Sequence, residues 1–225
     1  MASKYDLLEY DSDEEREKFP AVPMENLMSA ALFMASLFDR AGVPYGVMGD
    51  FAINLMGGER ETRDVDIAFQ APGKMRDLWD IVEGEERLIV PNTRLLSNIM
   101  KVFVLTGPNF DECTVTMPIE IDLIESGFQN SPRDLSTNRI ELQAKIGNET
   151  NSIYAVGLYY LLRGKLATYQ ARQDERDRSD IIHVLKKFPD EIREFATNLE
   201  SDTVSSFLES LPSYRREAIG GILEG

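Results

Sequence analysis

The sequence has little of what several common kinds of site require. It contains one cysteine, Cys113, and one histidine, His183, among 225 residues. A single cysteine excludes an intrachain disulfide and a cysteine-based zinc site, and it fits a reducing compartment. His183 lies in a mostly apolar segment, which favours a packed histidine over Ser-His-Asp hydrolysis or a histidine metal site. The Gly-x-x-x-x-Gly-Lys-Ser/Thr motif is also missing, which disfavours a P-loop ATPase.

Long hydrophobic runs are absent as well. The longest apolar stretch, residues 27–38, contains two serines and is too short to cross a bilayer. The first residues lead into an acidic segment, which is not the pattern of a signal peptide. We therefore expect a soluble, cytoplasmic protein with no membrane partner.

Positive charge is scarce. The chain has 24 Lys and Arg residues against 39 Asp and Glu residues, for a formal net charge of −15. Such a surface repels phosphate backbones, so nucleic acid is disfavoured as a partner, and residues 172–178 form only a weak basic patch. A small molecule or a protein fits better as substrate.

The chain is long enough, and at 43% hydrophobic residues apolar enough, to bury a sizeable core. We divide it into an acidic arm (1–22) that is mobile or loosely docked, a mixed α/β core (23–156) and a C-terminal helical region (157–225). The predicted class is α+β, with a mixed sheet, flanking helices and a helical bundle after them.

Local patterns place the individual elements. Strands are predicted at 45–48, 63–69, 87–90, 100–105, 118–124, 140–144 and 152–156. Helices are predicted at 24–41, 51–56, 74–84, 156–173, 177–187, 189–199, 201–210 and 212–223.

Carboxylates alternate with apolar residues on two of these strands. Asp64 and Asp66 are two positions apart and share one strand face, and Glu120 and Asp122 repeat the arrangement. Like charges side by side are unfavourable unless a cation lies between them, and carboxylate oxygens are the ligands that Mg²⁺ prefers. If the two strands are neighbours, a cluster of three carboxylates can hold two metal ions for phosphoryl transfer.

A phosphate-binding feature precedes the carboxylates. Gly49 and Asp50 join the strand at 45–48 to a short helix, whose exposed amide groups suit phosphate. Glycine also lets the backbone approach a ligand closely. Each piece alone has a plainer explanation, because Asp-x-Asp is often the solvent face of an edge strand and Gly49 an ordinary turn. Their order within about twenty residues favours chemistry.

That order resembles the nucleotidyltransferase superfamily, whose members include DNA polymerase beta, the aminoglycoside nucleotidyltransferases and the minimal nucleotidyltransferases. The family pattern is Gly-Gly or Gly-Ser, a short helix, then Asp-x-Asp or Asp-x-Glu, with a third Asp on a later strand. Here Gly49-Asp50 is similar to the first element, Asp64 and Asp66 to the second. Asp122 matches the third better than Glu120, because the family's third residue is usually an Asp between apolar residues.

The helical half is similar to the branch that contains AbiEii-type toxins. Gly164-Lys165-Leu166-Ala167 and Arg176-Asp177-Arg178-Ser179-Asp180-Ile181 resemble its Lys-Leu-x-Ala and Arg-Asp-x-x-Asp-Ile helices. The resemblance covers roughly residues 25–187 and implies that Lys165 contacts phosphate. A surface lysine at 165, and an ion pair with Arg176 or a helix cap at Asp180, explain these residues equally well.

Asp50 departs from the family pattern, which has Gly or Ser there. A carboxylate beside a triphosphate is costly unless a metal ion or a lysine offsets it. Asp50 is therefore compatible with an altered substrate, a different metal arrangement, a loss of transfer activity, or a helix N-cap.

The resemblance implies a nucleotidyltransferase that uses Mg²⁺ or Mn²⁺ and a nucleoside triphosphate such as ATP. Asp64, Asp66 and Asp122 would bind metal and catalyse transfer, with Asp122 as general base, and Gly49, Asp50 and Lys165 would bind the nucleotide. The acceptor would be a small molecule or a protein. The alternatives are a non-catalytic member of the fold that binds a nucleotide, small molecule or protein, and an acidic interaction protein whose carboxylates face solvent.

Overall fold

The computed structural model describes residues 1–11, 14, 17–94, 97–146 and 149–223. The strands are β1 (Ser3–Tyr5), β2 (Tyr45–Met48), β3 (Asp64–Phe69), β4 (Leu88–Pro91), β5 (Ile99–Thr106), β6 (Met117–Glu125), β7 (Arg139–Ile146) and β8 (Glu149–Val156). The helices are α2 (Met24–Ala41), α3 (Gly49–Leu55), α4 (Met75–Val82), α5 (Leu158–Arg172), α6 (Glu175–Lys187), α7 (Pro189–Phe195), a 3₁₀ turn (Ala196–Asn198), α8 (Ser201–Ser210) and α9 (Ser213–Leu223).

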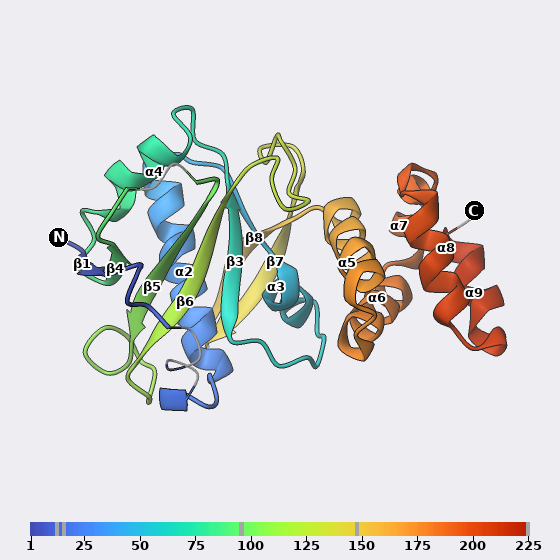
Figure 1. The fold of residues 1–225 in the computed structure, drawn as a ribbon, viewed down its shortest axis with the longest axis horizontal. Helices are drawn as coiled ribbons and strands as arrows, with labels where there is room; N and C mark the ends of the chain where they lie inside the picture. The colour runs from blue at the N-terminus through green and yellow to red at the C-terminus, as the bar shows by residue number, and fades with distance from the viewer. Residues whose placement is uncertain (12–13, 15–16, 95–96, 147–148, 224–225) are drawn as a thin grey trace.

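The described strands form one mixed sheet of eight, in the order β1-β4-β5-β6-β3-β2-β8-β7. The central strands β3 and β6 run parallel, while β5 pairs with β6 and β2 pairs with β3 in the antiparallel sense. The C-terminal helices lie beyond the β8 side of the sheet, with α5 and α6 next to α3 (Figure 1). Helices α7, α8 and α9 lie furthest from the N-terminus. The predicted α+β class is confirmed.

Helix α2 covers the apolar face of the sheet. Its side chains Leu27, Ala31, Met34 and Phe38 recur at helical spacing and are fully buried. The helix ends at Gly42, whose φ of +66° is a left-handed conformation that favours glycine. The apolar residues of β3 and β6 join the same core, and they are Val65, Ile67, Ile121 and Leu123. Because side chains alternate along a strand, the intervening carboxylates lie on the opposite face.

A second hydrophobic cluster holds the C-terminal helices together. It contains residues from α5 to α9 and one residue of α3, Ile53, whereas Phe51 and Ala52 of the same short helix belong to the core under α2. Helix α3 therefore contacts both clusters, which positions the residues at its start between the sheet and the helices. The division of the chain after residue 156 stays a prediction.

The predicted arm at residues 1–22 begins as part of the sheet. Ser3, Lys4 and Tyr5 pair in parallel with β4, and Arg63 donates hydrogen bonds to the backbone carbonyls of Phe19 and Pro20. The strand β1 was not predicted, because three residues are too few to show alternation. These contacts dock both ends of the arm, and its mobility stays a prediction.

The other predicted elements are found within a few residues of their expected limits. The predicted stripe of α4, Met75, Leu78, Trp79 and Val82, is buried. Strands β7 and β8 pair as predicted, although Gly147 and Asn148 of their predicted turn lie outside the described residues. In the described part of the chain, no helix is both long and apolar enough to span a membrane.

Candidate active site

The structure brings three predicted carboxylates together on the polar face of the sheet. In the parallel pairing of β3 and β6, Asp66 is directly opposite Asp122 and Asp64 is opposite Glu120. Neighbouring strands lie about 5 Å apart, so side chains on one face are in reach of a common ion. Asp64, Asp66 and Asp122 therefore lie on one face of two neighbouring strands, as the strand pattern predicts.

Burial and like charge raise the pKa values of Asp66 and Asp122. Burial, followed by the charges of Asp64, Asp122 and Asp50, raises the pKa of Asp66 to about 8. Burial also raises the pKa of Asp122, although the ammonium of Lys101 opposes the rise. Within the described residues the buried Oδ1 of Asp122 has no hydrogen-bond partner and lies 3.5 Å from Lys101 Nζ. Lys101 thus supplies one positive charge beside Asp122, which is less than the negative charge of the three carboxylates.

Gly49 packs directly against this cluster. Its φ is +65°, a conformation that side chains other than glycine adopt only with strain. A Cβ atom at this position would overlap Oδ2 of Asp66. Gly49 therefore gives the Asp66 carboxylate its space, which explains why glycine stands at the start of α3.

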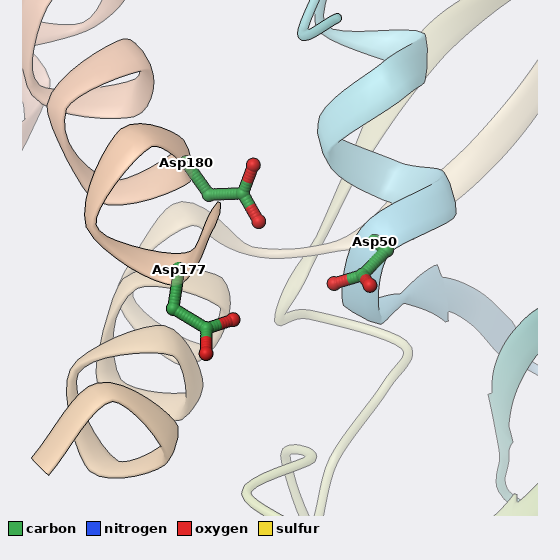
Figure 2. A group of neighbouring side chains, drawn as sticks. All are labelled: Asp50, Asp177 and Asp180. Atoms are coloured by element: carbon green, nitrogen blue, oxygen red, sulfur yellow. The ribbon is translucent and has the colours of Figure 1, made fainter. Parts of the chain in front are cut away.

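Asp50 and Lys165 belong to a network of ion pairs that links α3 to the helices. Lys165 Nζ pairs with Asp50 and, at 2.7 Å, with Asp180 Oδ2. Arg60, from the loop before β3, lies 2.6 Å from Asp50 Oδ2 and 2.9 Å from both Asp177 Oδ1 and Asp180 Oδ2. Figure 2 shows the three carboxylates, one from α3 and two from α6, pointing toward one another.

The network is balanced in charge and mostly buried. Arg172 adds a third cation, with its Nη2 atom 2.7 Å from Asp177 Oδ1, so three carboxylates face three cations. Burial acts to raise the pKa of Asp177, but hydrogen bonds from Arg172 and Arg60 outweigh it and hold that pKa below its ordinary value. The interpretation of Lys165 as a surface lysine is wrong, because its side chain is only 7% exposed.

Two other interpretations are corrected here. Asp50 lies in the first turn of α3, whose N-cap is Met48 with no side-chain capping bond, so Asp50 is not an N-cap. Asp180 pairs with Arg60 and Lys165, whereas Arg176 pairs with Asp174.

The carboxylates of Asp50, Asp177 and Asp180 lie close enough together to hold a metal ion. However, Lys165 and Arg60 already fill the space between these oxygens and neutralise them. A metal ion there would have to displace two cations. Among the described residues, Asp64, Asp66 and Asp122 do not form such a group, so a metal site on β3 and β6 stays a prediction.

A cavity of about 430 Å³ is lined both by the carboxylates of β3 and by members of the ion-pair network. Its lining includes Gly49, Asp50, Asp64 and Asp66 from the sheet side and Arg60, Tyr160, Gly164, Lys165, Thr168 and Arg172 from the loop before β3 and from α5. Asp122 is not among the described lining residues and lies beside Asp66 on the neighbouring strand. The cavity is large enough for a small ligand.

The fold and this site can be compared with known proteins. No protein-family model and no curated protein sequence matches the chain. Two solved structures are similar over most of their length. An antigenic nucleotidyltransferase-like protein from Paracoccidioides brasiliensis has a TM-score of 0.58 at 17% identity, covering 90% of this chain and 94% of its own. JHP933 from Helicobacter pylori has a TM-score of 0.51 at 13% identity, covering 91% and 95%. The chain has the nucleotidyltransferase fold.

Two sets of contacts in the site were not predicted from the sequence. Arg60 pairs with Asp177 and Asp180, which follow it in the chain by 117 and 120 positions. No local sequence pattern could reveal such distant pairs. On the other side, Lys101 pairs with Glu120, and the Tyr10 hydroxyl donates to Glu120 Oε2 at 3.0 Å. Glu120 thus shares Lys101 with Asp122 and has the Tyr10 hydroxyl as a further partner.

Proposed function

We propose that the protein is a metal-dependent nucleotidyltransferase that moves a nucleoside monophosphate from a nucleoside triphosphate to a small-molecule or protein acceptor. The observation that carries this proposal is that Asp64, Asp66 and Asp122 lie on one face of adjacent strands, and that Asp64 and Asp66 line a cavity together with Gly49. Three carboxylates with too little positive charge suit Mg²⁺ or Mn²⁺ chemically.

The residues fit a divalent ion. The pKa of Asp66 is raised by burial and by the charges around it, and the buried Oδ1 of Asp122 has no hydrogen-bond partner among the described residues. A divalent cation would reduce the repulsion between the carboxylates, and it would bind the Asp122 oxygen that lacks a hydrogen-bond partner. When bound, such an ion supplies charge neutralisation to a transferring phosphoryl group. Asp64, Asp66 and Asp122 would hold it.

The remaining residues are assigned roles by their position. Gly49 lets the backbone lie against the Asp66 carboxylate, and we propose that phosphate lies beside it, with Lys165 contacting the phosphate and Asp50 next to Lys165. We propose that Asp122 accepts the proton of an acceptor hydroxyl, and burial favours this role because it raises the pKa of the carboxyl group. The acceptor would enter between the sheet and α5, where the cavity lies.

Transfer itself is tested with labelled nucleotides. Incubating the protein with each labelled nucleoside triphosphate, Mg²⁺ or Mn²⁺ and a pool of small molecules and proteins should label an acceptor. Asp64→Ala should lower the rate at least about a thousandfold, because a metal ligand acts directly on the transition state. Asp190→Asn, on the exposed surface of α7, is the matched control and should retain full activity. Equal labelling by Asp64→Ala would contradict the assigned role.

Metal binding is tested by thermal unfolding. Millimolar Mg²⁺ or Mn²⁺ should raise the melting temperature of the wild type by about 5 °C, corresponding to about 2 kcal/mol of binding linkage. The shift should disappear in Asp64→Ala and persist in Asp190→Asn. An acidic interaction protein whose carboxylates only face solvent would show no metal-dependent shift in any of the three proteins.

A second candidate function is binding without transfer. The observation that favours it is that Lys165, Arg60 and Arg172, the cations of the cavity wall, are all paired with carboxylates. A repurposed member of the fold would bind a nucleotide, small molecule or protein in this cavity and show no turnover in the labelling assay.

A further inference from the structure

Asp50 differs from the two other carboxylates of its network in where it lies. The side chains of Asp177 and Asp180 are 0% and 4% exposed and are not part of the described cavity lining. The side chain of Asp50 is 25% exposed and lines the cavity. The cations Lys165 and Arg60 are therefore held by buried carboxylates from behind and by Asp50 on the cavity side.

Both oxygens of Asp50 are engaged, one by each cation. Oδ1 pairs with Lys165 Nζ, and Oδ2 lies 2.6 Å from Arg60 Nη2. Two cations that converge on one carboxylate can also bind a phosphate group, because phosphate oxygens accept the same charge-assisted hydrogen bonds. The carboxylate of Asp50 thus stands where a phosphate of a cavity ligand would make its contacts.

We propose that Asp50 is an internal competitor for the anion-binding site formed by Lys165 and Arg60, and that it limits the affinity of the cavity for polyphosphate. This inference rests on the proposed function, since it concerns the nucleotide side of the same cavity. A bound triphosphate must displace Asp50 from one or both cations, or bind with its charge neutralised by metal alone. Asp50 therefore sets how much negative charge the cavity accepts.

The buried half of the network should survive the loss of Asp50. Lys165 keeps Asp180 at 2.7 Å, and Arg60 keeps Asp177 and Asp180 at 2.9 Å. Removing Asp50 therefore leaves both cations oriented and without a carboxylate on the cavity side. A gain in anion affinity is expected, which a merely structural role could not produce.

The test uses inorganic tripolyphosphate as probe, with titration calorimetry in Mg²⁺ buffer. Asp50→Ser should bind it at least about tenfold more tightly than the wild type, because two charge-assisted contacts become available. The gain should shrink as salt is added and should disappear when Lys165→Gln is combined with Asp50→Ser. If Asp50→Ser does not fold, Asp50→Asn is used instead, because asparagine keeps the shape of the side chain and removes its charge. It should show the same gain in affinity.

Asp190→Asn is the matched control, because it removes the same charge from an exposed ion pair on α7. Its affinity should equal that of the wild type. Binding by both Asp50 variants that is no tighter than that of the wild type or of Asp190→Asn would overturn the proposal, even if the wild type transfers nucleotides. Tighter binding by Asp50→Ser supports it even if no transfer is ever observed, which separates this inference from the proposed function.

Discussion

Replacing Asp66 by asparagine should abolish transfer and, in the absence of metal, make the protein more stable at alkaline pH. Burial and the neighbouring carboxylates raise the pKa of Asp66 from 3.8 to about 8. An unfolded chain loses this proton near pH 4, whereas the folded protein keeps it until about pH 8. Between these values the folded state binds more protons, so its stability falls as pH rises, by at most about 1.4 kcal/mol per pH unit.

Asparagine removes this titration and nearly keeps the shape of the side chain. We expect Asp66→Asn and the wild type to have similar melting temperatures at pH 4.5, and the variant to be about 2 kcal/mol more stable at pH 8.5 with a chelator present. Added Mg²⁺ should reverse the order by stabilising only the wild type. Stability that falls equally in the two proteins between pH 4.5 and 8.5 would contradict the raised pKa.

Gly49→Ala should be among the most damaging substitutions in the chain. Alanine at a φ of +65° is strained, and its Cβ would overlap Oδ2 of Asp66. We expect a loss of about 3 kcal/mol or more in the free energy of unfolding, and a loss of metal binding because Asp66 must turn away from Asp64 and Asp122. Denaturant unfolding and the metal-dependent thermal shift measure the two effects.

Gly42→Ala is a matched control for the backbone part of this effect. Gly42 has nearly the same φ, +66°, but a Cβ there would meet no atom within 4 Å. It should cost about 1 kcal/mol from backbone strain and leave metal binding unchanged. If Gly49→Ala is no worse than Gly42→Ala, the close packing of Gly49 on Asp66 has no consequence for the site.

The site on the sheet could be predicted because its information is local. Asp64 and Asp66 alternate with buried residues on one strand, Asp122 does so on another, and the family resemblance indicates that these strands meet. Alternation fixes which face each carboxylate occupies, whatever the rest of the chain does. The positions of α2 and α4 follow from their apolar periodicity in the same way.

The ion-pair network could not be predicted, because its information is not local. Arg60, Lys165, Asp177 and Asp180 meet only after α3, α5 and α6 have packed together. A chain with 24 basic and 39 acidic residues permits very many pairings, and sequence does not rank them. The buried position of Lys165 follows from these partners, and its predicted contact with phosphate stays a prediction.

The two outer strands of the sheet have a consequence for how molecules meet. An outer strand exposes unpaired backbone groups that another chain can extend, and proteins counter this with very short strands or with charge. β1 has three residues, and β7 carries Arg139, Glu141, Gln143 and Lys145 at alternate positions. Neither outer strand is both long and apolar, so another chain has little to pair with. We therefore expect the sheet to resist aggregation through its edges.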